Sequence, residues 1–300
     1  MPTFRSFAKL NLHLEVVGRR ADGYHELRTI FQTIDLADEI EIERAAGGID
    51  LEVEGGGVAA GPENLVHRAA AAFLERWGAV GDGARLRLIK RIPAGGGLGG
   101  GSADAATVLL GMCSIWRVRP SYAELWPVAR ALGADVPFFL VGGTALGFGR
   151  GDEVVPLPDG DAAALELWLA LPPFGTPTPE VFAALGDAFR TAPSPLLLGA
   201  EIGAPPGRGR SRIGENDLEA PAFRLWPELE AIYTSLLGAG ASAVRMSGSG
   251  STLFALFEEP SAARAAGVSL PSGTKWLGIR TLRRADWRRA SGLDALEGGA

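Results

Sequence analysis

A ten-residue segment made mostly of glycine is the clearest chemical signal in the chain. Residues 93–102 read PAGGGLGGGS, and six of the ten lack a side chain. Backbone N–H groups can therefore approach an anion closely, and a helix that starts here adds the positive end of its dipole. A flexible linker has no use for the single Leu98 or for Ser102 at a helix start. The segment predicts a phosphate-binding loop that could hold a triphosphate.

The two common nucleotide-binding loops do not fit this segment. A P-loop ends in Gly-Lys followed by Ser or Thr, and a dinucleotide loop requires an acidic residue on the following strand. Neither feature is present. The loop therefore belongs to another class of nucleotide site.

A lysine and an asparagine lie two residues apart near the N-terminus. From residue 8 to residue 16 apolar residues alternate with polar ones, which is the period of a half-buried strand. Lys9 and Asn11 then share one face, about 7 Å apart. They can point into one site, although a solvated charge on an open strand face is the alternative for Lys9.

An aspartate precedes a strongly apolar segment in the middle of the chain. Asp135 is followed by Val136-Pro137-Phe138-Phe139. Apolar surroundings can shift the pKa of a carboxyl group, and such a group can accept a proton from a substrate hydroxyl. A helix N-cap is the alternative for Asp135.

An aromatic residue and an imidazole follow a turn signal near residue 22. Tyr24 and His25 come directly after Asp22-Gly23, which presents side chains at a loop. The pair suits a nucleobase, which would stack on the ring and be read at its edge by the imidazole. A surface Tyr-His pair of no function remains possible.

Helices and strands alternate irregularly around these residues, which favours an α+β protein. Asn64 predicts an N-capped helix at its start, and Ser121 with Glu124 forms a capping box. The expected helices are 65–77, 102–116, 122–132, 178–189 and 227–237. The expected strands cover most of residues 1–90 and then 144–148, 165–171, 242–246, 252–257 and 275–282, with a loop at 192–214.

Composition excludes several classes of protein. The chain has 300 residues, a formal net charge of −6 and no long basic run, so we expect no nucleic-acid partner. Its apolar runs are shorter than the roughly 20 residues that a membrane span requires, and no secretory signal is visible, so we expect a cytoplasmic protein. The single Cys113 excludes an intrachain disulfide, and His13 and His67 lack metal-ligand spacing.

Three segments resemble the motifs of the GHMP kinases. The glycine loop resembles their central motif, Pro-x-x-x-Gly-Leu-Gly followed by small residues. Residues 8–14 with 23–27 resemble the first motif, and residues 245–251 resemble the third. The all-glycine loop, together with Pro-Thr-Pro-x-x-Phe at 177–182, resembles the branch that phosphorylates 4-diphosphocytidyl-2-C-methyl-D-erythritol. The resemblance spans nearly the whole chain up to about residue 257.

The resemblance implies roles for individual residues. Asp135 would accept or orient the proton of the substrate hydroxyl, while Lys9 orients Asp135 and offsets charge on the transferring phosphoryl group. ATP would contact Asn64, Lys90, Pro93, Ala94, Gly95, Gly96, Gly97, Leu98, Gly99, Gly100, Gly101 and Ser102. The substrate would contact Asn11, Tyr24, His25, Thr178, Phe182 and Gly248, with cytosine held by Tyr24 and His25 and closed off by Phe182.

The resemblance also implies a fold and a reaction. It predicts an α+β two-domain GHMP kinase fold, with a domain like domain 2 of ribosomal protein S5 at 1–155, a ferredoxin-like domain at 156–285 and a surface tail at 286–300. ATP would be used with Mg²⁺ held mainly by its phosphates rather than by a protein metal site. The reaction would serve the non-mevalonate route to isoprenoid precursors, in a monomer or homodimer.

Two other functions remain open at this point. Another GHMP small-alcohol kinase, of the homoserine or mevalonate type, would leave Tyr24, His25 and Phe182 without a use. Phe182 could instead be ordinary helix core. A nucleotide-binding regulator without turnover should lack the pair formed by Lys9 and Asp135, which this chain has.

Overall fold

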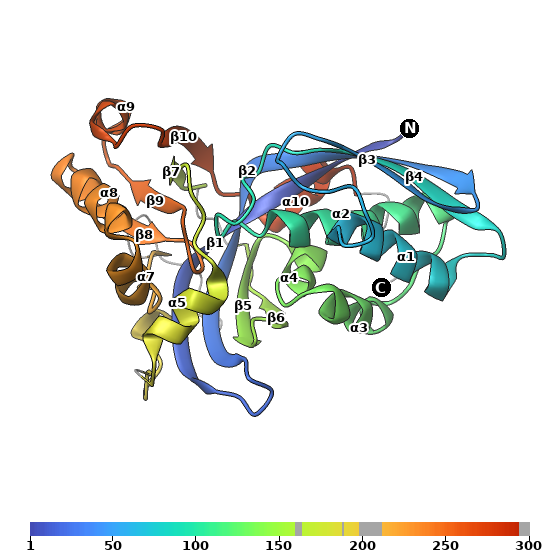
Figure 1. The fold of residues 1–300 in the computed structure, drawn as a ribbon, viewed down its shortest axis with the longest axis horizontal. Coiled ribbons are helices and arrows are strands. Elements are labelled where there is room, and N and C mark those ends of the chain that lie inside the picture. Colours follow the sequence, from blue (N-terminus) through green and yellow to red (C-terminus); the bar gives the residue numbers. More distant parts are fainter. Residues whose placement is uncertain (160–163, 188, 198–211, 294–300) are drawn as a thin grey trace.

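The molecule has two lobes, and each is built around a mainly antiparallel β-sheet (Figure 1). The computed structural model describes residues 1–159, 164–187, 189–197 and 212–293. The first sheet has six strands, in the order β3-β4-β2-β5-β6 with β1 paired to β2. These strands are β1 (Thr3–Arg19), β2 (His25–Ala46), β3 (Gly48–Glu54), β4 (Asp82–Ile89), β5 (Thr144–Gly149) and β6 (Glu153–Pro156).

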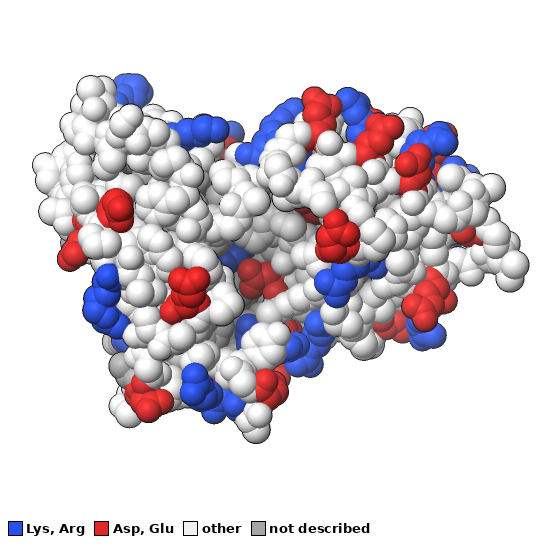
Figure 2. Space-filling model, in the orientation of Figure 1, with Lys and Arg blue, Asp and Glu red and all other residues white. Residues whose placement is uncertain are grey.

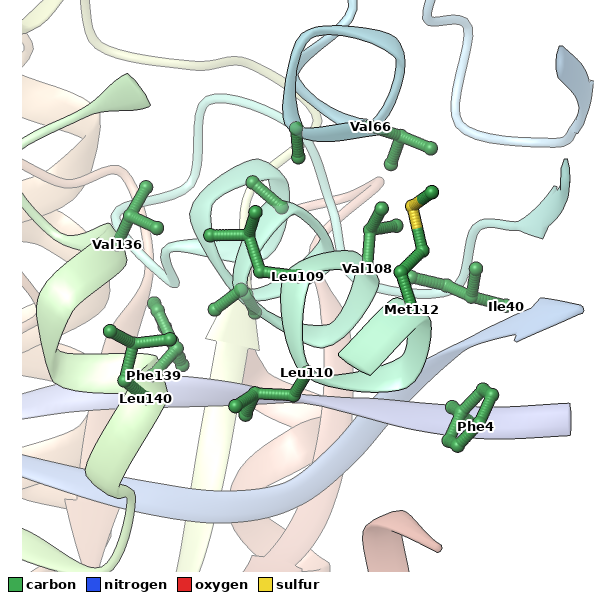
Figure 3. Close-up of a cluster of buried hydrophobic side chains, with 14 of the residues drawn as sticks. Phe4, Ile40, Val66, Val108, Leu109, Leu110, Met112, Val136, Phe139 and Leu140 are labelled. Carbon is green, nitrogen blue, oxygen red and sulfur yellow. The ribbon is translucent and has the colours of Figure 1, made fainter. Parts of the chain in front are cut away.

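Four helices that precede β5 in the chain pack in the first lobe. They are α1 (Leu65–Trp77), α2 (Gly100–Trp116), α3 (Tyr122–Leu132) and α4 (Val136–Val141). Helix α2 is rich in small residues and buried on nearly every side, as expected for a helix that is apolar all round. Figure 3 shows its side chains between α1, α4 and the strands, with Val108, Leu109, Leu110 and Met112 in the middle of the cluster.

The second lobe holds the four-stranded sheet, in the order β10-β7-β9-β8 with every neighbouring pair antiparallel. Its strands are β7 (Glu166–Leu171), β8 (Ala243–Met246), β9 (Leu253–Leu256) and β10 (Lys275–Arg280). Its helices are α5 (Thr178–Leu185), α7 (Glu219–Leu225), α8 (Pro227–Gly238), α9 (Pro260–Ala266) and the 3₁₀ turn η2 (Gly267–Ser269).

Strand β1 lies between the two lobes, which corrects the expectation of a half-buried strand. Its apolar residues Leu10 and Leu12 share a core cluster with Leu167 and Leu169 of β7. Its polar residues are buried as well: Lys9 and Asn11 are each 3% exposed. The alternation of residue types marked the two faces correctly, but both faces are covered by other parts of the chain.

The last helix corrects a second expectation. Helix α10 (Arg284–Ser291) returns to the first lobe, where Trp287 is 5% exposed in the core around α2. Residues 286–293 are therefore not a surface tail. The remaining tail prediction, at 294–300, lies outside the described residues, as does most of the loop predicted at 192–214.

Most other predicted elements agree with the structure. The helix predicted at 178–189 ends at Leu185. Helices α4, α7, α9 and α10 and strand β6 were not predicted. Cys113 is buried in the core around α2, as expected for a small hydrophobic residue. In the described part of the chain no helix is long and apolar enough to cross a membrane.

Candidate active site

Two adjoining cavities contain the predicted site residues, and the larger of the two lies between the lobes. One, of about 520 Å³, is lined by all twelve residues predicted to contact ATP, and the other, of about 730 Å³, by both predicted catalytic residues and all six predicted substrate contacts. Ser102 lines both cavities. Figure 2 shows the face between the lobes hollowed, with acidic and basic side chains inside the hollow. A donor in the first cavity would thus lie next to an acceptor in the second.

The glycine loop joins β1, α2 and the second lobe. The backbone N–H of Lys9 donates to the carbonyl of Leu98 at 3.0 Å. Helix α2 begins at Gly100, with Gly99 at the N-cap in the left-handed region at φ 69°. Ser102 is therefore inside the first turn and does not cap the helix, which corrects the sequence-based expectation. The first turn carries no acidic side chain, which leaves its N–H groups available to an anion.

The predicted catalytic pair is assembled in the second cavity. Lys9 Nζ lies 3.5 Å from Asp135 Oδ2 and donates to Asn11 Oδ1 at 2.6 Å. Asn11 Nδ2 in turn donates to Thr29 Oγ1 at 2.8 Å. The lysine side chain is buried, at 4% exposed, whereas that of Asp135 is 33% exposed. The chain of contacts fixes the ammonium group and leaves the carboxylate open to a ligand.

Asp135 occupies the N-cap position of α4 without capping it. Its side chain makes no cap hydrogen bond, and it lines the cavity beside Lys9 instead. The alternative of a purely structural N-cap therefore does not describe this side chain.

The third glycine motif closes the site from the second lobe. Ser247 Oγ donates to the carbonyl of Gly97 at 2.9 Å, and the Asn11 N–H donates to Ser247 Oγ at 3.3 Å. Gly248 has φ 58°, and a Cβ there would lie 3.5 Å from Lys9 Nζ. The three motifs, far apart in the sequence, are thus in direct contact around Lys9.

Aromatic side chains also line the second cavity. The rings of His25 and Phe182 stack with centroids 4.7 Å apart and planes 23° apart. Tyr24 is 54% exposed, and the guanidinium of Arg150 lies 4.9 Å from its ring centroid. A direct stack of His25 on Phe182 leaves no gap for a third ring between these two. A base in this cavity would have to use Tyr24 and the remaining ring surfaces.

His25 offers an unused hydrogen-bonding atom. Among the described residues its Nε2 is buried and has no hydrogen-bond partner. Burial, with a smaller contribution from the nearby Arg19, lowers the pKa of His25 below its ordinary value. The imidazole is therefore neutral near pH 7 and can offer one donor and one acceptor.

A buried ion cluster lies below the glycine loop, and the sequence alone did not reveal it. Lys90 Nζ contacts the carboxylates of both Asp38 and Asp104, the latter at 2.8 Å. Asp38 also accepts the N–H of Ile92 at 2.8 Å. Burial alone would lower the pKa of Lys90, but the two carboxylates outweigh it and hold the pKa above the ordinary value. Asp104 stands out in the sequence as an acid inside an apolar helix, whereas Asp38 gives no such signal.

His13 is buried on the polar face of β1, although the alternation of residue types predicted a half-buried strand. It is 1% exposed; its Nδ1 accepts the N–H of Glu215 at 2.9 Å, and its Nε2 lies 3.1 Å from Glu15 Oε1. Burial lowers its pKa despite the neighbouring Glu15. Across the described ranges, no group of three or more His, Cys, Asp or Glu residues is placed to hold a metal ion.

Family profiles and known relatives identify the family of this chain. The profile for the GHMP kinase N-terminal domain matches residues 64–143, and that for the GHMP kinase C-terminal domain matches residues 204–272. A protein of Moorella thermoacetica is 43% identical over 268 residues, covering 87% of this chain and 92% of its own. One of Thermus thermophilus is 42% identical over 274 residues, covering 90% and 94%. This chain therefore belongs to the GHMP kinases.

The particular family within the GHMP kinases follows from the names of these relatives. Both are named 4-diphosphocytidyl-2-C-methyl-D-erythritol kinase. A crystal structure of 4-(cytidine 5'-diphospho)-2C-methyl-D-erythritol kinase has a TM-score of 0.75 at 38% identity, over 93% of this chain and 99% of that one. A homoserine kinase from Cytophaga hutchinsonii, at TM-score 0.68 and 20% identity, shares the fold. The predicted α+β GHMP kinase fold is confirmed, and the chain belongs to the family of 4-diphosphocytidyl-2-C-methyl-D-erythritol kinases.

Proposed function

We propose that this protein transfers the γ-phosphate of ATP to the 2-hydroxyl of 4-diphosphocytidyl-2-C-methyl-D-erythritol, giving the 2-phosphate and ADP. The observation that carries the proposal is the meeting of the two cavities at Ser102, with the Lys9–Asp135 pair in the acceptor cavity. The family membership supports the same substrate. The reaction serves the non-mevalonate route to isoprenoid precursors.

Asp135 and Lys9 are the proposed catalytic residues. The open carboxylate of Asp135 accepts or orients the hydroxyl proton while the hydroxyl oxygen attacks the γ-phosphorus in line. Lys9, held between Asn11 and Asp135, orients the carboxylate and offsets charge on the phosphoryl group. The bond to the β-phosphate oxygen breaks, and the proton leaves on Asp135.

The glycine loop and the start of α2 hold the phosphates of ATP. Their backbone N–H groups and the helix dipole favour negative charge. Asn64 and Lys90 line the same cavity toward α1 and β4. Mg²⁺ would be bound mainly by the phosphates, which is its usual position in nucleotide sites. Ser102, which lines both cavities, is the residue whose hydroxyl we propose as a protein ligand.

The aromatic residues favour a cytidine substrate over a small alcohol. Tyr24 and Phe182 offer ring faces to a base, and the neutral His25 offers its unpartnered Nε2 to a base edge. Thr178 and Gly248 line the same cavity as these residues and Lys9. A homoserine or mevalonate kinase would leave the aromatic residues without a role.

Four further properties belong to the proposal. The domains are 1–155 and 156–285, with the substrates meeting between them, although α10 crosses back to the first lobe. The protein works in the cytoplasm on small molecules, as a monomer or homodimer, and binds no nucleic acid.

The decisive experiment measures ADP release with Mg-ATP and three acceptors: 4-diphosphocytidyl-2-C-methyl-D-erythritol, homoserine and mevalonate. We expect turnover with the first alone. Asp135→Ala should abolish turnover while ATP binding stays nearly unchanged, and Asp50→Ala, at a surface ion pair with Arg85, should behave as wild type. Turnover with another alcohol would refute the assigned substrate, and an active Asp135→Ala variant would refute the catalytic role.

A further inference from the structure

The turn that carries Gly248 is held along an open sheet edge by side chains. Strand β8 is an edge strand of the second sheet. The Met246 N–H donates to Glu219 Oε1 at 2.8 Å, and the two N–H groups of Asn216 reach the carbonyls of Met246 at 2.7 Å and Gly248 at 2.8 Å. An edge strand leaves backbone N–H and carbonyl groups without a strand partner. Here the side chains of Glu219 and Asn216 bind these groups instead.

The same segment is bonded to β1. The Leu14 N–H donates to the carbonyl of Glu215 at 2.9 Å, and the Asp217 N–H donates to the carbonyl of Leu14 at 3.0 Å. The Val16 N–H donates to Asp217 Oδ2 at 2.9 Å. Residues 215–219, which we term the strap, therefore connect the strand that carries Lys9 to the turn beside it.

The hydrogen bonds that Asn216 makes with the turn are buried, so water cannot replace a lost partner there. Asn216 is 5% exposed, Met246 is fully buried, and the Leu218 N–H donates to Asn216 Oδ1 at 2.9 Å, which fixes the amide orientation. A buried carbonyl that loses its hydrogen-bond donor is destabilised, so we expect the turn to move together with the strap. Neither Asn216 nor Glu219 lines either cavity.

We propose that Asn216 and Glu219 are positioning residues for phosphoryl transfer, which rests on the proposed kinase function. By holding both sides of Ser247, they fix the Gly248 backbone against Lys9 and the glycine loop. They act through the turn and touch no reactant. We term the hydrogen bonds from Asn216 and Glu219 to residues 246–248 the clamp. Loss of the clamp shifts the turn, and a displacement of about 1 Å near reacting groups can lower the rate by roughly 100-fold.

Four variants test the proposal. Asn216→Asp keeps the size and the acceptor for Leu218 but sets carboxyl oxygens against two carbonyls. Glu219→Ala removes the acceptor for Met246, whereas Glu219→Gln keeps it. Glu228→Gln, exposed on α8, is the control. We expect kcat to fall roughly 10- to 100-fold in the first two, with little change in binding of a non-hydrolysable ATP analogue, and to stay near wild type in the others.

Amide hydrogen exchange provides a readout that does not depend on the substrate. We expect the Met246 amide to exchange faster in Asn216→Asp and Glu219→Ala than in wild type. Unchanged exchange in both, or kcat per folded molecule equal to wild type with only a lower melting temperature, would overturn the proposal. Glu219→Gln as impaired as Glu219→Ala would also overturn it. A wild-type protein without turnover would refute the kinase function. The exchange data would still show whether Asn216 and Glu219 hold the turn in place. If Asn216→Asp does not fold, the comparison of Glu219→Ala with Glu219→Gln tests the proposal.

Discussion

Replacing Gly97 by alanine should damage both the fold and the activity, because this residue touches the backbone of the third glycine motif. A Cβ at Gly97 would lie 2.0 Å from the carbonyl oxygen of Ser247 and 3.0 Å from that of Gly250. The residue also has φ 74°, in the left-handed region that side chains disfavour. Neither obstacle can be relieved by rotating a side chain.

The magnitude follows from these two contributions. The left-handed conformation costs a non-glycine residue about 1–2 kcal/mol, and overpacking costs about 1–3 kcal/mol. If the loop keeps its position, the free energy of unfolding should fall by about 2–5 kcal/mol. If the loop moves away instead, the contact between Ser247 and the loop is lost, and kcat/KM for ATP should fall by at least roughly 10-fold.

The assay compares Gly97→Ala with a matched glycine substitution. Gly238 lies exposed at the end of α8, and a Cβ there would meet nothing within 4 Å. Urea unfolding and steady-state ADP release should leave Gly238→Ala close to wild type. A Gly97→Ala protein as stable and as active as the Gly238→Ala control would refute the close packing of the second and third motifs.

Three other changes have outcomes that the structure sets. Phe182→Ala should raise KM for the cytidine substrate roughly 5- to 150-fold, since stacking contributes about 1–3 kcal/mol per base; an equal rise in KM for ATP would contradict this. Lys90→Met should destabilise the protein by about 3–5 kcal/mol in urea unfolding because it leaves two buried carboxylates without their cation, whereas Arg85→Met, at an exposed ion pair, should change little. Burial raises the pKa of Glu219 to about 7 from an ordinary 4.5. The stability that protonated Glu219 contributes is fully present below pH 4.5 and is lost as the pH rises through 7. The free energy of unfolding of wild type should therefore fall relative to that of Glu219→Gln across this range, by roughly 3 kcal/mol in total. Parallel pH profiles of the two proteins in urea unfolding would contradict this.

The local elements followed from local signals. Helix α1 begins where Asn64 provides a cap: its side chain accepts the Val66 N–H at 2.9 Å. The capping box of Ser121 and Glu124 likewise marks the start of α3. These signals are readable because the interacting groups lie within a few residues of each other. The start of α2 was predicted two residues too late, because Gly99 occupies the N-cap position and Ser102 does not.

Long-range burial was not readable from the sequence. The polar residues of β1 have the pattern of an exposed face, but that face is covered by the glycine loop, by Arg190 and Ser194, and by residues 214–217. One hydrogen-bond partner of His13 is Glu215, some two hundred residues later, and α10 packs on the first lobe instead of ending in solvent. No periodicity carries information about which distant segment will cover a strand.

The sequence by itself determined the chemistry available to this protein: a glycine loop for phosphates, a lysine, an aspartate and an aromatic group. Each is a property of residue type and near neighbours, so each can be read along the chain. Only the tertiary structure decided that Lys9 lies 3.5 Å from Asp135 and that Lys90 is buried between two carboxylates. It also decided that Asn216 and Glu219 clamp the third motif, because contacts between distant residues depend on how the two lobes close around β1.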